Sequence, residues 1–247
     1  MTVAPEAAEE ARAALLELFP GGFEESESSG ELLLAAYTDG AGELRLRTAF
    51  GEVRSEAVAP GWEDRWRTFH RPVRVGGLWI GPPWEQPPRD ATAVVIDPGR
   101  AFGTGAHPTT RLTLELLLDC HGGSLLDVGS GSGVLAIAAA KLGFVPVVGL
   151  DIDEVAVEAT RRNAQLNGVA VETYVLDATV VDVPPADIVV ANITAEFVEQ
   201  AAPHVNAPRF IASGYLASQR PTPAGYRPTS RASDDGWAAD AFARTGK

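Results

Sequence analysis

The chain has 247 residues, 45% of them hydrophobic, and a formal net charge of −13 at pH 7, so it can build one large domain, or a medium domain with a small one, around a real core. No Lys/Arg-rich run is present, which argues against direct binding of nucleic acid; the acidic charge favours a basic protein as partner, unless it serves solubility alone. The single cysteine excludes an internal disulfide, and no apolar run approaches the roughly 20 residues of a membrane span. The acidic N-terminus lacks the basic start of a signal peptide. We therefore expect a cytoplasmic protein without a membrane partner.

The first 60 residues predict a small α+β domain. Residues 4–18 read as a helix that stops at Pro20-Gly21-Gly22, and residues 31–38 and 43–50 read as two strands. The intervening Asp39-Gly40-Ala41-Gly42 has the turn chemistry of a β-hairpin. One helix and one hairpin are too small to be stable alone. We therefore expect this piece, an incomplete substrate-recognition domain, to pack against another part of the protein.

Residues 61–90 predict a linker of one helix and one strand. Trp62, Trp66 and Phe69 recur at the spacing of one helix face, residues 71–80 read as a strand, and the Pro-rich residues 82–90 end this part. Residues 91–247 then form the main domain.

A loop rich in glycine and hydroxyl side chains follows a short strand at residues 93–96. It runs from Asp97 to Thr110 and contains a proline, Pro108, just before an amphipathic helix that continues to about Asp119. Such a loop caps the helix, and its small donors can also fold over a ligand. An ordinary capped loop is the alternative.

The stretch 125–153 predicts strand, glycine turn, helix and second strand. Residues 125–128 and 147–150 are short apolar runs, and residues 134–142 are rich in Ala, Leu and Ile. A parallel pair of strands with a helical crossover is the seed of a doubly wound sheet.

The glycine turn itself predicts a nucleoside site. Gly129, Gly131 and Gly133 let the backbone bend sharply and let a ligand approach, and the helix start favours an anionic group there. Asp151 closes the next strand, where a carboxylate can accept both hydroxyls of a ribose. A tight strand-to-helix turn without a ligand is the alternative.

The spacing of the glycines distinguishes between cofactors. A dinucleotide fingerprint would place its third glycine at Val134. The pattern that begins at Asp127, D-V-G-x-G-x-G, instead resembles the first motif of the class I S-adenosylmethionine-dependent methyltransferases. A nicotinamide-dependent oxidoreductase is the alternative.

Two later strands end in polar residues that suit a site. Asp177 and Ala178 follow a strand at residues 173–176, where a carboxylate or a backbone amide can hold an adenine amino group, unless this is a plain surface turn. Asn192 follows the strand at residues 186–191, and its carbonyl can accept a hydrogen bond from a substrate N–H, unless it only makes a turn.

The remaining elements extend the sheet. Residues 154–166 and 195–205 predict crossover helices, and residues 210–212 a further strand. Residues 217–224 are too short and Pro-rich for a crossover helix. Residues 226–233 and 237–244 predict a terminal antiparallel hairpin. We therefore expect an α/β, doubly wound, mostly parallel, Rossmann-like methyltransferase sheet with a small N-terminal α+β domain.

Several motifs together resemble the bacterial ribosomal protein L11 methyltransferases, over roughly residues 62–219. The matching segments keep the family's order: Phe102-Gly103-Thr104-Gly105, His107-Pro108-Thr109-Thr110-Arg111, the motif from Asp127 to Ala138, Val148-Gly149-Leu150-Asp151-Ile152-Asp153, Asn163, Asn167-Gly168-Val169 and Ala191-Asn192-Ile193. That family uses S-adenosylmethionine to methylate amino groups of one large-subunit ribosomal protein.

The resemblance implies roles for individual residues. Thr110, Gly129, Asp151 and Asn192 would contact the cofactor, and the loop at 102–107 would lie over it, near the transfer site. The predicted cofactor-binding set is Phe102, Gly103, Thr104, Thr110, Asp127, Gly129, Gly131, Gly133, Asp151, Ile152, Asp177 and Asn192. The predicted catalytic residues are Asn192 and His107, and for His107 a cap or loop contact is the alternative.

The predicted reaction is methyl transfer to amino groups, of lysine side chains or the N-terminus, in a large-subunit ribosomal protein. A lysine amine, with a pKa of about 10.4, must first lose its proton, and burial in a dry pocket lowers that pKa. We expect positioning and desolvation to do most of the work, in a monomer. The four histidines and one cysteine show no metal-ligand spacing. Methylation of another protein or a small amine, and a cofactor-binding module that has lost catalysis, are the alternatives.

Overall fold

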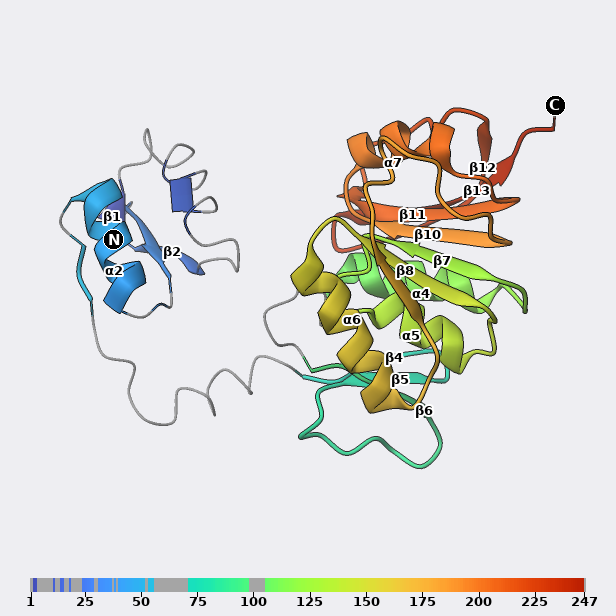
Figure 1. Cartoon of the computed structure of the whole chain (residues 1–247), viewed down its shortest axis with the longest axis horizontal. Coiled ribbons are helices and arrows are strands. Elements are labelled where there is room, and N and C mark those ends of the chain that lie inside the picture. The colour runs from blue at the N-terminus through green and yellow to red at the C-terminus, as the bar shows by residue number, and fades with distance from the viewer. Residues whose placement is uncertain are drawn as a thin grey trace. The chain divides into compact units, whose positions relative to one another are not determined.

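The computed structural model describes residues 2–3, 11, 14–15, 18, 24–28, 31–36, 38, 40–51, 53–55, 71–97 and 105–246. The chain divides into two compact units, Met1–Asp64 and Arg65–Lys247, and each is described by itself (Figure 1). The predicted division into residues 1–60, 61–90 and 91–247 stays a prediction. The helix predicted from the Trp62, Trp66 and Phe69 stripe lies outside the described residues.

The first unit contains a three-stranded antiparallel sheet and a helix. The strand order is β1 (Thr2–Val3), β3 (Glu31–Ala35) and β2 (Glu24–Ser28), and helix α2 spans Gly40–Phe50. Leu34 of β3 lies in a small apolar cluster. Of the predicted helix at residues 4–18, the described residues 11, 14, 15 and 18 are helical.

The predicted hairpin of residues 31–38 with 43–50 is wrong, because residues 43–50 belong to helix α2 and β3 pairs with β2 instead. The alternation of Leu44 and Leu46 with charged residues suggested a strand. In the helix, Leu44 is 66% exposed, whereas Leu46 and Phe50, four residues apart, pack on the apolar cluster. An ion pair of 2.8 Å joins Arg47 Nη2 to Glu43 Oε1, also four residues apart. Helical spacing therefore accounts for both the buried and the charged side chains.

The second unit begins with a small sheet that packs against the helices of the main sheet. Strands β4 (Val73–Val75) and β5 (Leu78–Gly81) are antiparallel, and β6 (Thr92–Val95) lies parallel to β5. The single strand predicted over residues 71–80 is thus two strands, because Gly76, with φ of 55°, turns the chain. Val94 is fully buried in the same core as residues of helix α5 (Val134–Lys141).

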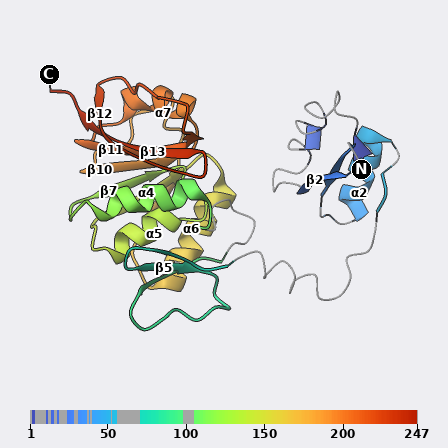
Figure 2. The ribbon, with the colours of Figure 1, turned by 180° about the vertical axis from the view of Figure 1, so that it is seen from behind.

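The main sheet has seven strands in the order β12-β13-β11-β10-β7-β8-β9; the strands of its part from β12 to β7 are labelled in Figure 2. The five central and edge strands from β11 to β9 run parallel, and β13 is antiparallel to both of its neighbours. This confirms the doubly wound, mostly parallel sheet. The bounds are β7 Leu125–Val128, β8 Val147–Asp151, β9 Glu172–Val175, β10 Ile188–Asn192, β11 Arg209–Leu216, β12 Tyr226–Asp234 and β13 Trp237–Arg244.

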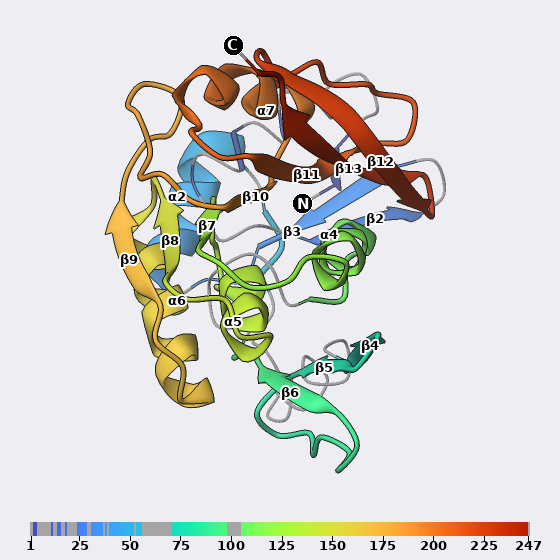
Figure 3. The same cartoon turned by 90° about the vertical axis from the view of Figure 1, so that its right-hand side faces the viewer.

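Helices cover both faces of this sheet (Figure 3). One face packs on α4 (Pro108–Leu118), α5 (Val134–Lys141) and α6 (Glu154–Asn167), and the other on α7 (Ala195–Ala201), which tightens into a 3₁₀ turn at Ala202–His204. Strand β10 shows the division: Val190 lies in the core on the α4–α6 side and Val189 in the core on the α7 side. Both are fully buried, as expected for a central parallel strand.

The predicted terminal hairpin is confirmed, and it completes the sheet. Asp235 and Gly236 have φ of 49° and 78°, which fits a two-residue turn with both residues in the left-handed region. The preceding connection, residues 217–225, has no helix, as its length predicted. Pro221 and Pro223 are buried there instead, and Arg231 Nη2 donates to the Ala217 carbonyl at 2.9 Å.

No helix in the described ranges has both the length and the apolar character needed to cross a membrane.

Candidate active site

The glycine turn between β7 and α5 adopts a backbone that only glycine takes easily. Gly129, Gly131 and Gly133 have φ of 73°, 55° and 83°. A Cβ on Gly129 would lie 2.4 Å from Ile193 Cδ1, and one on Gly133 would lie 3.0 Å from Thr160 Cα. The turn therefore requires glycine for its conformation and for the close approach of its neighbours.

Asp151 is joined directly to this turn. Its Oδ2 accepts a hydrogen bond from the Gly131 N–H at 2.9 Å, and its Oδ1 accepts one from the Asp153 N–H at 3.0 Å. The carboxylate is thus oriented at the end of β8. Because a carboxylate oxygen has two lone pairs, each oxygen can still accept a hydroxyl.

Asp127 supplies a buried carboxylate behind the turn. Its Oδ2 accepts from the Ala136 N–H at 3.0 Å, whereas Oδ1 has no hydrogen-bond partner among the described residues. Burial raises the pKa of this carboxyl to about 7, with the Ala136 bond opposing the rise and the Asp151 charge adding to it. A buried acceptor without a donor fits a ligand that brings a cationic group, which would favour the ionised form.

Thr110 and Asn192 meet across the site from α4 and β10. Asn192 Nδ2 donates to Thr110 Oγ1 at 3.2 Å, which leaves Oδ1 of the amide as an acceptor. The chain then passes between two glycines, because a Cβ on Gly129 or on Gly214 would collide with Ile193. The end of β10 is therefore fixed beside the glycine turn.

His107 is the N-cap of α4. The Thr109 N–H donates to His107 Nδ1 at 3.4 Å, and Thr109 Oγ1 lies 2.8 Å from the same nitrogen. Partial burial of the ring, and then the charge of Arg111, lower the pKa of His107. A neutral ring whose Nδ1 accepts carries its proton on Nε2, so it offers no lone pair to a substrate proton. The capping alternative has direct geometric support, and the catalytic role stays a prediction.

The other predicted positions lie at the same edge or outside the described residues. Asp177 Oδ1 accepts from the Thr179 N–H at 2.9 Å and the Thr179 hydroxyl at 2.6 Å, and these bonds, the hydroxyl first, lower the pKa of Asp177. Ile152 is 70% exposed next to Asp151, which suits contact with a flat ring. Phe102, Gly103 and Thr104 lie outside the described residues.

Comparison with known proteins decides the family. Residues 25–239 match the family described as "Ribosomal protein L11 methyltransferase (PrmA)". The chain belongs to this family. A ribosomal protein L11 methyltransferase from Symbiobacterium thermophilum is 39% identical over 224 residues, covering 79% of this chain and 74% of that protein.

Other relatives agree over a shorter length. The ribosomal protein L11 methyltransferase of Aeromonas hydrophila is 47% identical over 171 residues, 65% of this chain, and the chain spans only 58% of that protein's length. The crystal structure of ribosomal protein L11 methylase from Lactobacillus delbrueckii subsp. bulgaricus is 30% identical, covers 72% of this chain and 100% of its own, and has a TM-score of 0.65. The likeness extends to the fold.

Asn163, which matches the pattern of the L11 methyltransferase family but had no predicted role, makes a further contact beside the glycine turn. Asn163 is 2% exposed on α6; its Nδ2 donates to the Ser132 carbonyl at 2.9 Å and its Oδ1 accepts from the Asp97 N–H at 3.0 Å. It therefore links the glycine turn to the end of the small sheet. The available signal was a pair of amides, Asn163 and Asn167, on the apolar face of a predicted helix.

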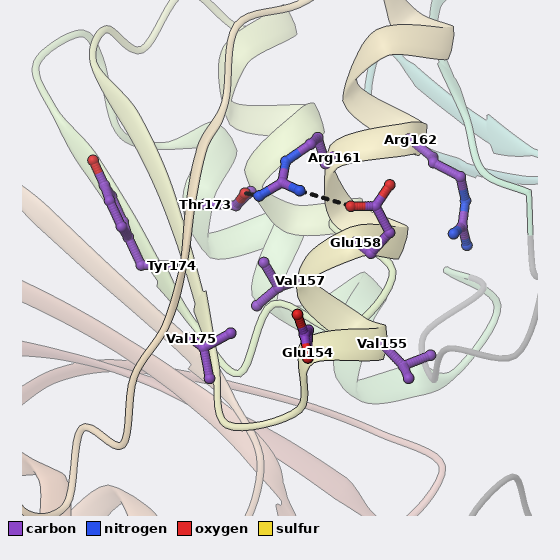
Figure 4. Close-up of a pocket in the computed structure, with 9 residues that line it drawn as sticks. All are labelled: Glu154, Val155, Val157, Glu158, Arg161, Arg162, Thr173, Tyr174 and Val175. Atoms are coloured by element: carbon purple, nitrogen blue, oxygen red, sulfur yellow. Dashed lines mark hydrogen bonds and ion pairs between the residues drawn. The ribbon is translucent and has the colours of Figure 1, made fainter.

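Within the described part of this L11 methyltransferase family member, no group of three or more His, Cys, Asp or Glu side chains could hold a metal ion. A groove does lie between α6 and β9 (Figure 4), where Arg161 contacts Glu158 Oε2 at 2.7 Å and Thr173 Oγ1 at 3.1 Å. None of the predicted site residues lines it. The groove therefore shares no lining residue with the predicted site, although its Val175 pairs with Asp151 in the sheet.

Proposed function

We propose that this protein is an S-adenosylmethionine-dependent methyltransferase that methylates amino groups of ribosomal protein L11. The observation that carries the proposal is the bond from the Gly131 N–H to Asp151 Oδ2, because it joins the glycine turn and the carboxylate that would bind the ribose into one unit. Asn192 lies beside the same turn through the contact of Ile193 with Gly129. The names of the relatives support the choice of substrate.

The chain's own residues suit the parts of this cofactor. Asp151 would accept from the ribose hydroxyls, and Ile152 and Asp177 would hold the adenine. The N-terminal amides of α5 would meet the methionine carboxylate. Asp127, whose Oδ1 has no donor among the described residues, would favour the nearby α-ammonium. When bound, the cofactor supplies an electrophilic methyl group on a sulfonium.

Asn192 would position the acceptor amine. Thr110 holds its Nδ2, so Oδ1 can accept one N–H of the amine and direct the nitrogen lone pair toward the cofactor. The amine must first lose a proton, and exclusion of water favours its neutral form. With Nδ1 of His107 engaged by Thr109, we assign the capping role to His107 and the rate enhancement to positioning and desolvation.

The substrate follows from charge as well as from the family. A net charge of −13 complements a lysine-rich protein and repels nucleic acid. We infer that lysine side chains, or the N-terminal amine, are the acceptors, and that the enzyme acts as a cytoplasmic monomer. The C-terminal strands complete the sheet, which favours an active enzyme over a binding module that has lost catalysis.

Mass spectrometry of L11 after incubation with S-adenosylmethionine tests the proposal. We expect added methyl groups with the wild-type protein and weaker cofactor binding in Asp151→Ala, with Asp90→Ala, an exposed carboxylate between β5 and β6 that is not among the predicted site residues, as the matched control. Asn192→Ala should lower kcat by about 10- to 100-fold, and any loss of cofactor affinity should be smaller than in Asp151→Ala.

Three results would count against the proposal. Binding of the cofactor without transfer would favour a non-catalytic module. Transfer to another protein or a small amine would correct the substrate, and binding of a nicotinamide cofactor instead would refute the reaction class.

A further inference from the structure

The turn between β12 and β13 presents two side chains to the start of α4. Asp234 and Trp237 form the cross-strand pair that closes the hairpin, with Asp235 and Gly236 as the turn between them. The two side chains of such a pair lie on one face of the sheet. Helix α4 packs against β11, β12 and β13 on that face (Figure 3).

Each member of the pair contacts a different residue of α4. The ring of Trp237 meets the ring of His107 edge-to-face, with centroids 4.8 Å apart and an interplanar angle of 71°. Asp234 Oδ2 lies 2.5 Å from Arg111 Nη2. His107 and Arg111 are four residues apart and therefore lie on one face of the helix. The contact is a two-point dock between a helix face and a cross-strand pair.

The dock reaches the residues of the transfer site. Arg111 Nη1 also donates to the Ala106 carbonyl at 3.0 Å, so the same guanidinium holds the backbone just before the helix. Thr110, adjacent to Arg111, accepts the hydrogen bond from Asn192. A shift of the first turn of α4 would therefore move the partner that orients the Asn192 amide.

The ion pair of the dock contributes little to holding the fold together. The side chains of Arg111 and Asp234 are 30% and 53% exposed, and ion pairs this open to solvent stabilise proteins weakly. The buried residues Leu112, Leu114 and Leu117 secure α4 against the core. What the ion pair and the ring contact add is the position of the helix start.

We propose that the β12–β13 turn is a positioning element of the methyl-transfer site, with Asp234 and Trp237 setting the place of Thr110 opposite Asn192. The inference rests on the proposed methylation of L11. Asp234 and Trp237 act through α4, so they are positioning residues.

Kinetics of full-length variants with L11 test this role. Asp234→Asn should lower kcat about tenfold, since small misplacements in a transfer site are costly, while cofactor affinity stays within about twofold. Asp235→Asn, in the same turn, is the matched control and should behave as wild type. Trp237→Phe should retain most of the activity that Trp237→Leu loses. Near-wild-type kcat in both Asp234→Asn and Trp237→Leu would overturn the proposal.

A readout independent of activity separates this inference from the proposed function. In the NMR spectrum of histidine-labelled protein, Trp237 should shift the His107 ring signals through its ring current. Asp234→Asn should move those signals and Asp235→Asn should not; unmoved signals in a folded Asp234→Asn protein would overturn the inference. Failure of wild-type protein to methylate L11, with the signals behaving as expected, would refute only the proposed function.

Discussion

Burial of Asp127 should make the free energy of unfolding of this protein depend on pH, and the substitution Asp127→Asn should remove that dependence. Burial raises the pKa of its carboxyl from 3.8 to about 7. Below about pH 4 the carboxyl is protonated in both the folded and the unfolded chain. As the pH rises from about 4 to about 7, the unfolded chain ionises and the folded chain resists, so the free energy of unfolding falls. Above about pH 7 the loss is constant.

The size of the effect follows from the shift. A rise of about three pKa units corresponds to about 4 kcal/mol, of which about 2–3 kcal/mol is lost between pH 5 and pH 7. Asp127→Asn keeps an acceptor for the Ala136 N–H but cannot ionise. Its own cost is independent of pH, so relative to wild type the variant should gain about 2–3 kcal/mol over this interval.

Urea unfolding of the cofactor-free protein between about pH 5 and pH 8 measures the difference. Every other titrating group is common to both proteins, so the contributions of the groups that do not interact with Asp127 cancel. Asp187→Asn is the control, because hydrogen bonds from Ser124 lower the pKa of Asp187, so its difference from wild type should be flat above pH 5. Parallel curves for wild type and Asp127→Asn would refute the reasoning.

Two further substitutions test the packing around the glycine turn. In urea unfolding, Gly133→Ala should lower the free energy of unfolding more than Gly143→Ala does. At both positions φ is near 90° (83° and 92°), so an alanine carries a backbone strain of about 1–2 kcal/mol. Only at Gly133 does the new Cβ also collide with Thr160. Equal losses of unfolding free energy in the two variants would show that Thr160 moves aside without cost, which would contradict the prediction. Asn163→Leu removes the acceptor of the Asp97 N–H and should cost about 1–3 kcal/mol; faster hydrogen exchange at Asp97 would locate the loss, and unchanged exchange would contradict it.

The sheet and the glycine turn were predictable because their signals are local. Short apolar runs ending in Asp127, Asp151 and Asn192 mark buried parallel strands whose ends carry polar groups, and the structure places these ends at one edge. The terminal hairpin was predicted from its two strands, and Asp235 and Gly236 between them have the left-handed backbone of a two-residue turn.

The features that could not be predicted depend on contacts between residues that lie far apart in the sequence. Helix α2 was mistaken for a strand because alternation and helical spacing coincide over a few residues, and only the apolar cluster around Leu34 shows which side is buried. The role of Asn163 depends on Ser132 and Asp97, whose distance from α6 no local pattern encodes. The dock of Trp237 on His107 joins residues that only the finished sheet brings together.

The connection between β11 and β12 contains no helix, and this should affect which substitutions the family tolerates. Here Arg231 secures the short connection by its bond to the Ala217 carbonyl while it pairs with the buried Asp240 at 2.9 Å. In a homologue whose connection is longer and helical, the apolar face of that helix can cover the sheet. The Arg231 guanidinium is then no longer needed to hold the connection in place. Arg231 and Asp240 should therefore be kept or replaced together across the family, in step with the length of the segment that precedes them.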